Sequence, residues 1–97
     1  MNPSPSLKTE EATFVQANGL RIYYEAHGTG TPVILIHGGL ETCQMWAPAI
    51  PSLSMNYMTI TPDSRGHGRS DNPTGQFSYS LMAADMAQFI KRVVNPD

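Results

Sequence analysis

Two glycine-containing segments of this chain have residue types that can stabilise a developing negative charge. The first, His37-Gly38-Gly39, follows a short apolar run, and the second, residues 63–71, follows another. Backbone N–H groups in a glycine loop at the end of a strand can face an oxygen that becomes an oxyanion during acyl transfer. No Gly-x-Ser-x-Gly turn, which would carry a serine nucleophile, occurs in the 97 residues. The sequence therefore predicts part of an active site.

The serines and the cysteine near these segments are poor candidates for a nucleophile. The pentapeptide 68–72 has a central serine but ends in Asn, and the pentapeptide 62–66 begins with Pro, so neither is a nucleophile turn. Cys43 is the only cysteine, which excludes an internal disulfide. A lone thiol at the start of a helix is usually a small packing residue. We therefore expect no catalytic nucleophile, acid or base in this chain.

His37, Asp63 and His67 could converge on a metal ion from adjacent strand ends, because imidazole and carboxylate groups are suitable ligands. The three residues are not close neighbours in sequence, which weakens this interpretation. Alternatively, both imidazoles organise their loops through ring-to-backbone hydrogen bonds, which we favour. Residues 66–71 also lack one glycine of a dinucleotide-binding fingerprint. We expect neither a metal nor a cofactor.

The strands expected around these segments follow from hydrophobic patterning. Residues 13–17 and 20–26 flank Asn18-Gly19, a strong signal for a two-residue hairpin turn. Residues 33–36 are apolar throughout, as in a strand that is covered on both faces. Residues 57–61 form the next β-prone run, and both glycine segments would then lie at the carboxyl ends of neighbouring parallel strands.

Two helical segments complete the pattern. Residues 41–54 have apolar residues at near-helical spacing, but Pro48 and Pro51 predict a short or kinked helix. Ser80 is expected to cap a final helix. The apolar face of that helix would consist of Met82, Met86, Phe89, Ile90 and Val93.

The element order predicts an α/β fold, with an antiparallel hairpin followed by two parallel strands and two helices. Residues 12–97 would form one partial domain, and residues 1–11, with two prolines and three charges, a flexible tail. No residues remain after the final helix for the next parallel strand, which leaves an unpaired sheet edge. We therefore expect the chain to be truncated before the nucleophile turn, or to be one piece of a larger assembly.

Composition limits the partners and the compartment. The hydrophobic fraction is 40%, the formal net charge is -2, and Lys and Arg total six, which argues against nucleic acid and anionic membranes as partners. No apolar stretch approaches the roughly 20 residues needed to span a bilayer. The first eleven residues lack the apolar region of a secretory signal. We expect a globular, cytoplasmic protein.

Taken together, the two motifs resemble those of the α/β-hydrolase superfamily, in which His-Gly-x follows the third strand and Asp-x-Arg-Gly-x-Gly-x-Ser follows the fourth. The resemblance covers roughly residues 12–94. It implies that Gly39 gives one backbone N–H to an oxyanion hole. It also implies loop-organising roles for the other motif residues, which are His37, Gly38, Asp63, Arg65, Gly66, His67, Gly68 and Ser70.

The resemblance further implies a hydrolase that acts on a small ester, lactone or related acyl or carbon-carbon substrate by serine nucleophilic catalysis. The serine, acid and histidine would lie beyond residue 97, so we expect the 97-residue chain alone to be inactive. Leu40 replaces the proline of the epoxide hydrolase pattern, and Gly39 replaces the Asn or Glu of many haloalkane dehalogenases. Both subclasses are therefore disfavoured, whereas esterase, lactonase, carbon-carbon hydrolase and cofactor-free haloperoxidase remain open.

A non-catalytic interaction module is the alternative, in which the open sheet edge pairs with a C-terminal portion, another polypeptide or a second copy. Exposed backbone at residues 33–36 would make the chain marginally stable and prone to self-association through that edge. We also expect a carboxylate partner for Arg65, either Asp63 or, preferably, Asp85, because a charge that is removed from water needs a counter-charge.

Overall fold

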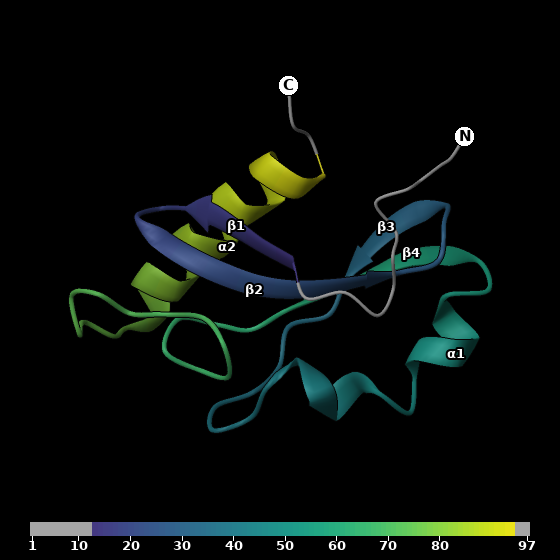
Figure 1. Cartoon of the computed structure of the whole chain (residues 1–97), viewed down its shortest axis with the longest axis horizontal. Coiled ribbons are helices and arrows are strands. Elements are labelled where there is room, and N and C mark those ends of the chain that lie inside the picture. Colours follow the sequence, from purple (N-terminus) through teal and green to yellow (C-terminus); the bar gives the residue numbers. More distant parts are fainter. Residues whose placement is uncertain (1–12, 95–97) are drawn as a thin grey trace.

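The computed structural model describes residues 13–94, which form one four-stranded mixed sheet with helical segments on both faces (Figure 1). The strands are β1 (Thr13–Ala17), β2 (Leu20–His27), β3 (Thr31–Ile34) and β4 (Tyr57–Pro62). Their spatial order is β1-β2-β4-β3, so β1 and β3 are the two edges of this sheet. The predicted α/β class is confirmed. The expected tail, residues 1–11, lies outside the described residues.

The antiparallel hairpin of β1 and β2 is confirmed. Ala17 pairs with Leu20, so Asn18 and Gly19 form a two-residue loop with φ values of 52° and 79°. Positive φ at both central residues is the requirement of a type I′ turn, which Asn-Gly meets at low steric cost. Strand β2 continues to His27 because its last residues pair with β4.

The parallel pair β3 and β4 is also confirmed, but the predicted bounds of β3 were wrong. The strand begins at Thr31 and ends at Ile34, two residues earlier than expected at each end. One further backbone hydrogen bond joins Leu35 N–H to the Ile60 carbonyl oxygen, and the chain then leaves the sheet. Ile36 is 48% exposed, because it stands in the loop and not in the covered sheet.

The helices differ from the prediction in two details. The segment expected as one short or kinked helix contains a 3₁₀ turn η1 (Cys43–Trp46) and a single turn α1 (Ile50–Leu53), with Pro51 at its start. Helix α2 (Tyr79–Val93) is capped by Ser78, whose hydroxyl accepts from the Leu81 N–H, and not by Ser80. Ser78 has the extended backbone of a capping residue, whereas Ser80 already lies inside the first turn.

Helix α2 covers one face of the sheet, and η1 and α1 lie across the other (Figure 1). Between α2 and the sheet is the apolar core, made of Ala17, Leu20, Ile22, Ile60, Met86 and Phe89. Side chains alternate along a strand, so Thr61 faces the opposite side from Ile60. The core packs α2 against the sheet, and the two glycine loops leave the sheet at the carboxyl ends of β3 and β4.

Candidate functional site

The loops that leave β3 and β4 are joined by His37. Its Nε2 accepts a hydrogen bond from the Ser64 N–H at 2.9 Å, and its Nδ1 lies 2.7 Å from the Gly38 carbonyl oxygen. A ring nitrogen that accepts from an amide carries no proton, so the proton is on Nδ1 and the ring is neutral. The buried ring therefore has no nitrogen left to act as a base.

His67 makes the same kind of bridge in the opposite direction. Its Nε2 accepts from the Leu40 N–H at 3.2 Å, and its Nδ1 donates to the Arg65 carbonyl oxygen at 2.9 Å. The ring stacks on Phe77, with centroids 5.6 Å apart, and lies 5.1 Å from the His37 ring. Both imidazoles thus make ring-to-backbone hydrogen bonds of the kind expected from the sequence.

Asp63 ties the two loops together through its carboxylate. One oxygen accepts from the Cys43 N–H at 2.7 Å and the other from the Arg69 N–H at 3.0 Å. Its backbone carbonyl accepts from the Ser70 hydroxyl, which in turn accepts from the Tyr23 N–H. The carboxylate is buried and accepts hydrogen bonds from two backbone amides, so Asp63 is not the ion-pair partner of Arg65.

Arg65 pairs with Asp85 on α2, as preferred from the sequence. The guanidinium Nε and one terminal nitrogen donate to the two carboxylate oxygens at 2.9 and 2.8 Å. The side chains are 3% and 1% exposed, and hydrogen bonding to Asp85 raises the pKa of Arg65 above its ordinary value. Asn72 accepts from the remaining guanidinium nitrogen, and Asn18 donates to Asp85. The ion pair connects the second loop to the helix and to the hairpin turn.

Gly38 and Gly39 begin a turn that presents an unused donor. Glu41 N–H donates to the Gly38 carbonyl oxygen, and Leu40 has a φ of 65°, two features of a type II turn. Gly38 N–H donates to the Glu41 carboxylate, but the Gly39 N–H has no acceptor among residues 13–94. Both glycines line an apolar groove of about 830 Å³ between the loops and α2. Its apolar wall includes Ile36, Phe77, Tyr79, Met82 and Met86.

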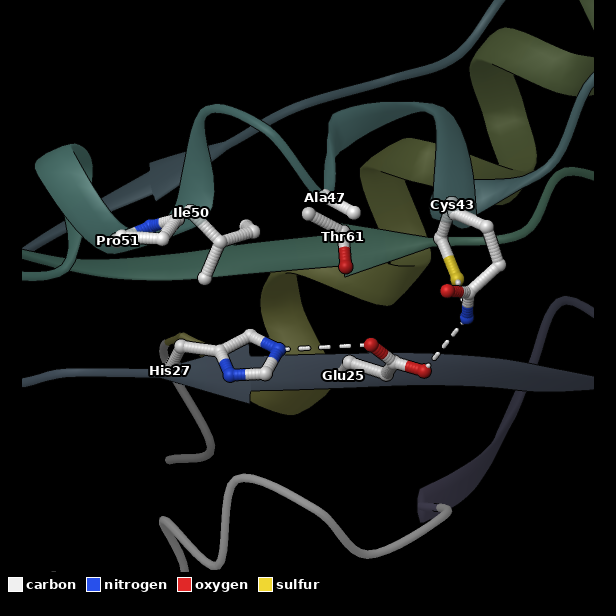
Figure 2. Close-up of a pocket in the computed structure, with 8 residues that line it drawn as sticks. Glu25, His27, Cys43, Ala47, Ile50, Pro51 and Thr61 are labelled. Atoms are coloured by element: carbon white, nitrogen blue, oxygen red, sulfur yellow. Dashed lines mark hydrogen bonds and ion pairs between the residues drawn. The ribbon is translucent and has the colours of Figure 1, made fainter.

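A second cavity, of about 230 Å³, lies on the other face of the sheet (Figure 2). Glu25 accepts there from Gln44 Nε2 at 3.0 Å, from the Tyr23 hydroxyl at 2.5 Å, and lies 3.4 Å from His27 Nε2. Its carboxylate therefore has several donors around it. Among residues 13–94, no group of three or more His, Cys, Asp or Glu side chains is arranged to hold a metal ion.

Cys43 lines the second cavity, and its thiol is expected to react slowly. Burial, together with the charges of Asp63 and Glu25, raises its pKa from 9.0 to about 12. At pH 8 the thiolate fraction is then about 1,000-fold lower than in an unfolded chain, and only the thiolate is nucleophilic. Alkylation by iodoacetamide, followed by mass spectrometry, should be slower than in concentrated urea by about that factor. Equal rates in the two conditions would contradict the structure.

Some residues that shape the site were not identified from the sequence. Ser64 donates its amide to His37, Phe77 supports His67, and Asn72 and Asn18 complete the surroundings of the Arg65 ion pair. The Asn18-Gly19 signal predicted a turn but carried no information on what the Asn side chain would contact. No helix among residues 13–94 has the length and apolar character needed to cross a membrane.

Comparison with known proteins extends the likeness over most of the chain. The family described as the alpha/beta hydrolase fold matches residues 31–96. A soluble epoxide hydrolase of Corynebacterium sp. (strain C12) is 35% identical over 85 residues, which cover 86% of this chain and 30% of that protein. Haloalkane dehalogenase 2 of Mycobacterium bovis is 32% identical, with 81% of this chain and 27% of that protein covered. The crystal structure of bromoperoxidase from Bacillus anthracis superposes with a TM-score of 0.79 at 34% identity, covering 87% and 32%.

These relatives do not support the prediction, made from positions 39 and 40, that the chain is unlike epoxide hydrolases and haloalkane dehalogenases. An epoxide hydrolase and a haloalkane dehalogenase are both similar to the chain, although the residues at positions 39 and 40 argued against both classes. Two residues of one turn carry less information than a likeness over 79 to 85 residues. The chain spans about 30% of the length of these relatives. By its sequence, its sheet order and its paired loops, the chain belongs to the α/β-hydrolase fold family.

Proposed function

We propose that this chain is the N-terminal portion of an α/β-fold hydrolase and supplies one backbone donor, the Gly39 N–H, to its oxyanion hole. The observation that carries the proposal is that this amide lacks an acceptor within the described range 13–94, whereas the amides of Gly38, Leu40 and Glu41 all have one there. A donor that is held in place and unused in the resting state is suited to an oxygen that becomes negative only during the reaction.

The proposed substrate is a small molecule with an ester, lactone or related acyl bond, and the proposed compartment is the cytoplasm. A serine beyond residue 97 would attack the carbonyl carbon while a histidine takes the serine proton and an acid orients that histidine. The carbonyl oxygen would become an oxyanion and accept from the Gly39 N–H and from a second amide next to the serine.

The remaining part of such an enzyme has a natural place beside this sheet. Strand β3 is an edge, and it runs parallel to β4. A right-handed crossover from α2 would lay the next parallel strand along β3, and a following helix would cover the apolar groove. We therefore propose residues 12–97 as part of one domain that a C-terminal portion completes.

Two substitutions at Gly39 test the proposed donor in the longest polypeptide that the gene encodes. Gly39→Pro removes the N–H yet suits the second position of a type II turn, and is expected to lower kcat for an activated short-chain ester about 100- to 1,000-fold. Gly39→Ala keeps the N–H, and a Cβ there meets no atom within 4 Å, so this control should stay within about threefold of the parent. Equal kcat values for the two variants would refute the role of the amide. Turnover that a serine-directed fluorophosphonate does not abolish would refute the serine.

The second candidate is an interaction module that uses the β3 edge, and the unpaired edge beside an apolar groove is the observation that favours it. A gene that ends at residue 97, together with the absence of ester turnover, would support this candidate. Sedimentation of the purified chain should then show a dimer or larger species. Amide exchange should show protected amides in β3 (Thr31–Ile34) only in that associated form.

A further inference from the structure

We infer that His67 is a positioning residue of this site, whose ring holds the turn at Leu40 and thereby fixes the direction of the Gly39 N–H. The inference rests on the proposed function of Gly39. It begins from the backbone of Leu40, whose φ of 65° lies in the left-handed region. A residue with a β-carbon adopts this region only when its surroundings compensate for the steric strain.

The Leu40 side chain gives no such compensation, because it is 99% exposed. The turn is held by hydrogen bonds instead. Glu41 N–H donates to the Gly38 carbonyl at a long 3.3 Å, and Leu40 N–H donates to His67 Nε2 at 3.2 Å. The imidazole is therefore the one side chain that binds the strained residue directly among residues 13–94. The Leu40 N–H belongs to the Gly39–Leu40 peptide, which adjoins the Gly38–Gly39 peptide that carries the donor. Loss of this bond would therefore leave both peptides freer to rotate about the Gly39 dihedral angles.

His67 is suited to this task because its own position is fixed from two sides. Its Nδ1 donates to the Arg65 carbonyl oxygen, and its ring stacks on Phe77 at an interplanar angle of 23°. Arg65 is in turn held by the buried pair with Asp85. The hydrogen bond to Arg65 keeps the proton on Nδ1 and leaves Nε2 free as an acceptor. A rigid connection thus runs from the core side of α2 to the turn.

Two substitutions at His67, of similar size, test whether the acceptor atom Nε2 holds Leu40 independently of the rest of the ring. The terminal amide of Gln lies as far from the backbone as Nε2, so His67→Gln can still accept from Leu40. The amide of Asn lies at the distance of Nδ1, so His67→Asn keeps only the bond to Arg65. In the 97-residue chain, exchange of the Leu40 amide should be about five- to tenfold faster in H67N and within about twofold of the parent in H67Q.

The Ile60 amide in β4, measured in the same spectra, reports global unfolding. Faster exchange at Leu40 with unchanged exchange at Ile60 would support the inference. Unchanged exchange at Leu40 in H67N, or equal acceleration at both amides, would overturn it. Neither readout depends on activity, so this test remains valid even if Gly39→Pro shows that the proposed donor has no role.

The effect on the reaction is expected to depend on the strain at Leu40. In the longest encoded polypeptide, H67N should lower kcat for the ester at least about tenfold, with KM within about threefold of the parent. H67Q should keep most of the parent kcat. Glycine adopts a positive φ readily. In the Leu40→Gly background, H67N should therefore lower kcat less than threefold. An equal loss in both backgrounds would show that His67 acts by some route other than the turn.

Discussion

Replacing Asp85 with alanine is expected to lower the free energy of unfolding of the chain by about 3–5 kcal/mol. The substitution leaves the Arg65 guanidinium, 3% exposed, without its counter-charge, and leaves the Asn18 amide without its acceptor. Breaking a buried ion pair from one side costs about 3–5 kcal/mol. Small domains have a total stability of about 5–15 kcal/mol, so the loss is a large part of it. Urea titration followed by circular dichroism measures the change in the free energy of unfolding.

A double variant separates the unpaired charge from the loss of packing. Arg65→Met combined with Asp85→Leu removes both charges and keeps apolar volume, so it should recover much of the stability that Asp85→Ala loses. If Asp85→Ala unfolds the chain completely, the comparison can be made in the presence of a stabilising osmolyte. A loss below about 1 kcal/mol for Asp85→Ala would mean that Arg65 reaches water, contrary to the burial described above.

The second large effect is expected from Gly68→Ala. Gly68 has a φ of 53°, and a β-carbon there would lie 2.2 Å from Asp63 Oδ2. The carboxylate has no easy way to retreat, because it accepts from the amides of Cys43 and Arg69. The left-handed backbone costs about 1–2 kcal/mol and overpacking about 1–3 kcal/mol, so we expect a total loss of about 3 kcal/mol.

Gly75→Ala is the matched control in the same loop. Gly75 has a φ of 73°, but a β-carbon would meet no atom within 4 Å, so only the backbone cost of about 1–2 kcal/mol applies. The difference between the two variants in chemical denaturation isolates the contact with Asp63. Equal losses would show that the Asp63 carboxylate moves aside freely.

Sequence patterns predicted the parts of this molecule that depend on local chemistry. Asn18-Gly19 predicted the hairpin because few residues accept positive φ at both turn positions. The two apolar runs predicted β3 and β4 as parallel neighbours, and the glycine motifs then fell at one end of the sheet. The need for a counter-charge predicted the pairing of Arg65 with Asp85.

Features that depend on tertiary contacts were placed wrongly or missed. Ser78 and Ser80 are equally good capping residues, and the chain direction before α2 selects Ser78. Strand β3 begins earlier than its apolar run because Thr31 pairs with Tyr57, a contact that hydrophobicity does not indicate. The left-handed Leu40 breaks a local preference, and it does so beside the candidate donor.

The sheet order has a consequence for synthesis on the ribosome. Strands β2 and β3 are consecutive in the chain but lie on either side of β4, which is made later. The β1–β2 hairpin can therefore close on its own, while β3 waits for β4 to leave the exit tunnel. At about 5–20 residues per second the delay lasts a few seconds, during which an apolar strand has no partner. Nascent chains that are halted between β3 and β4 should be the ones that ribosome-associated chaperones bind most strongly.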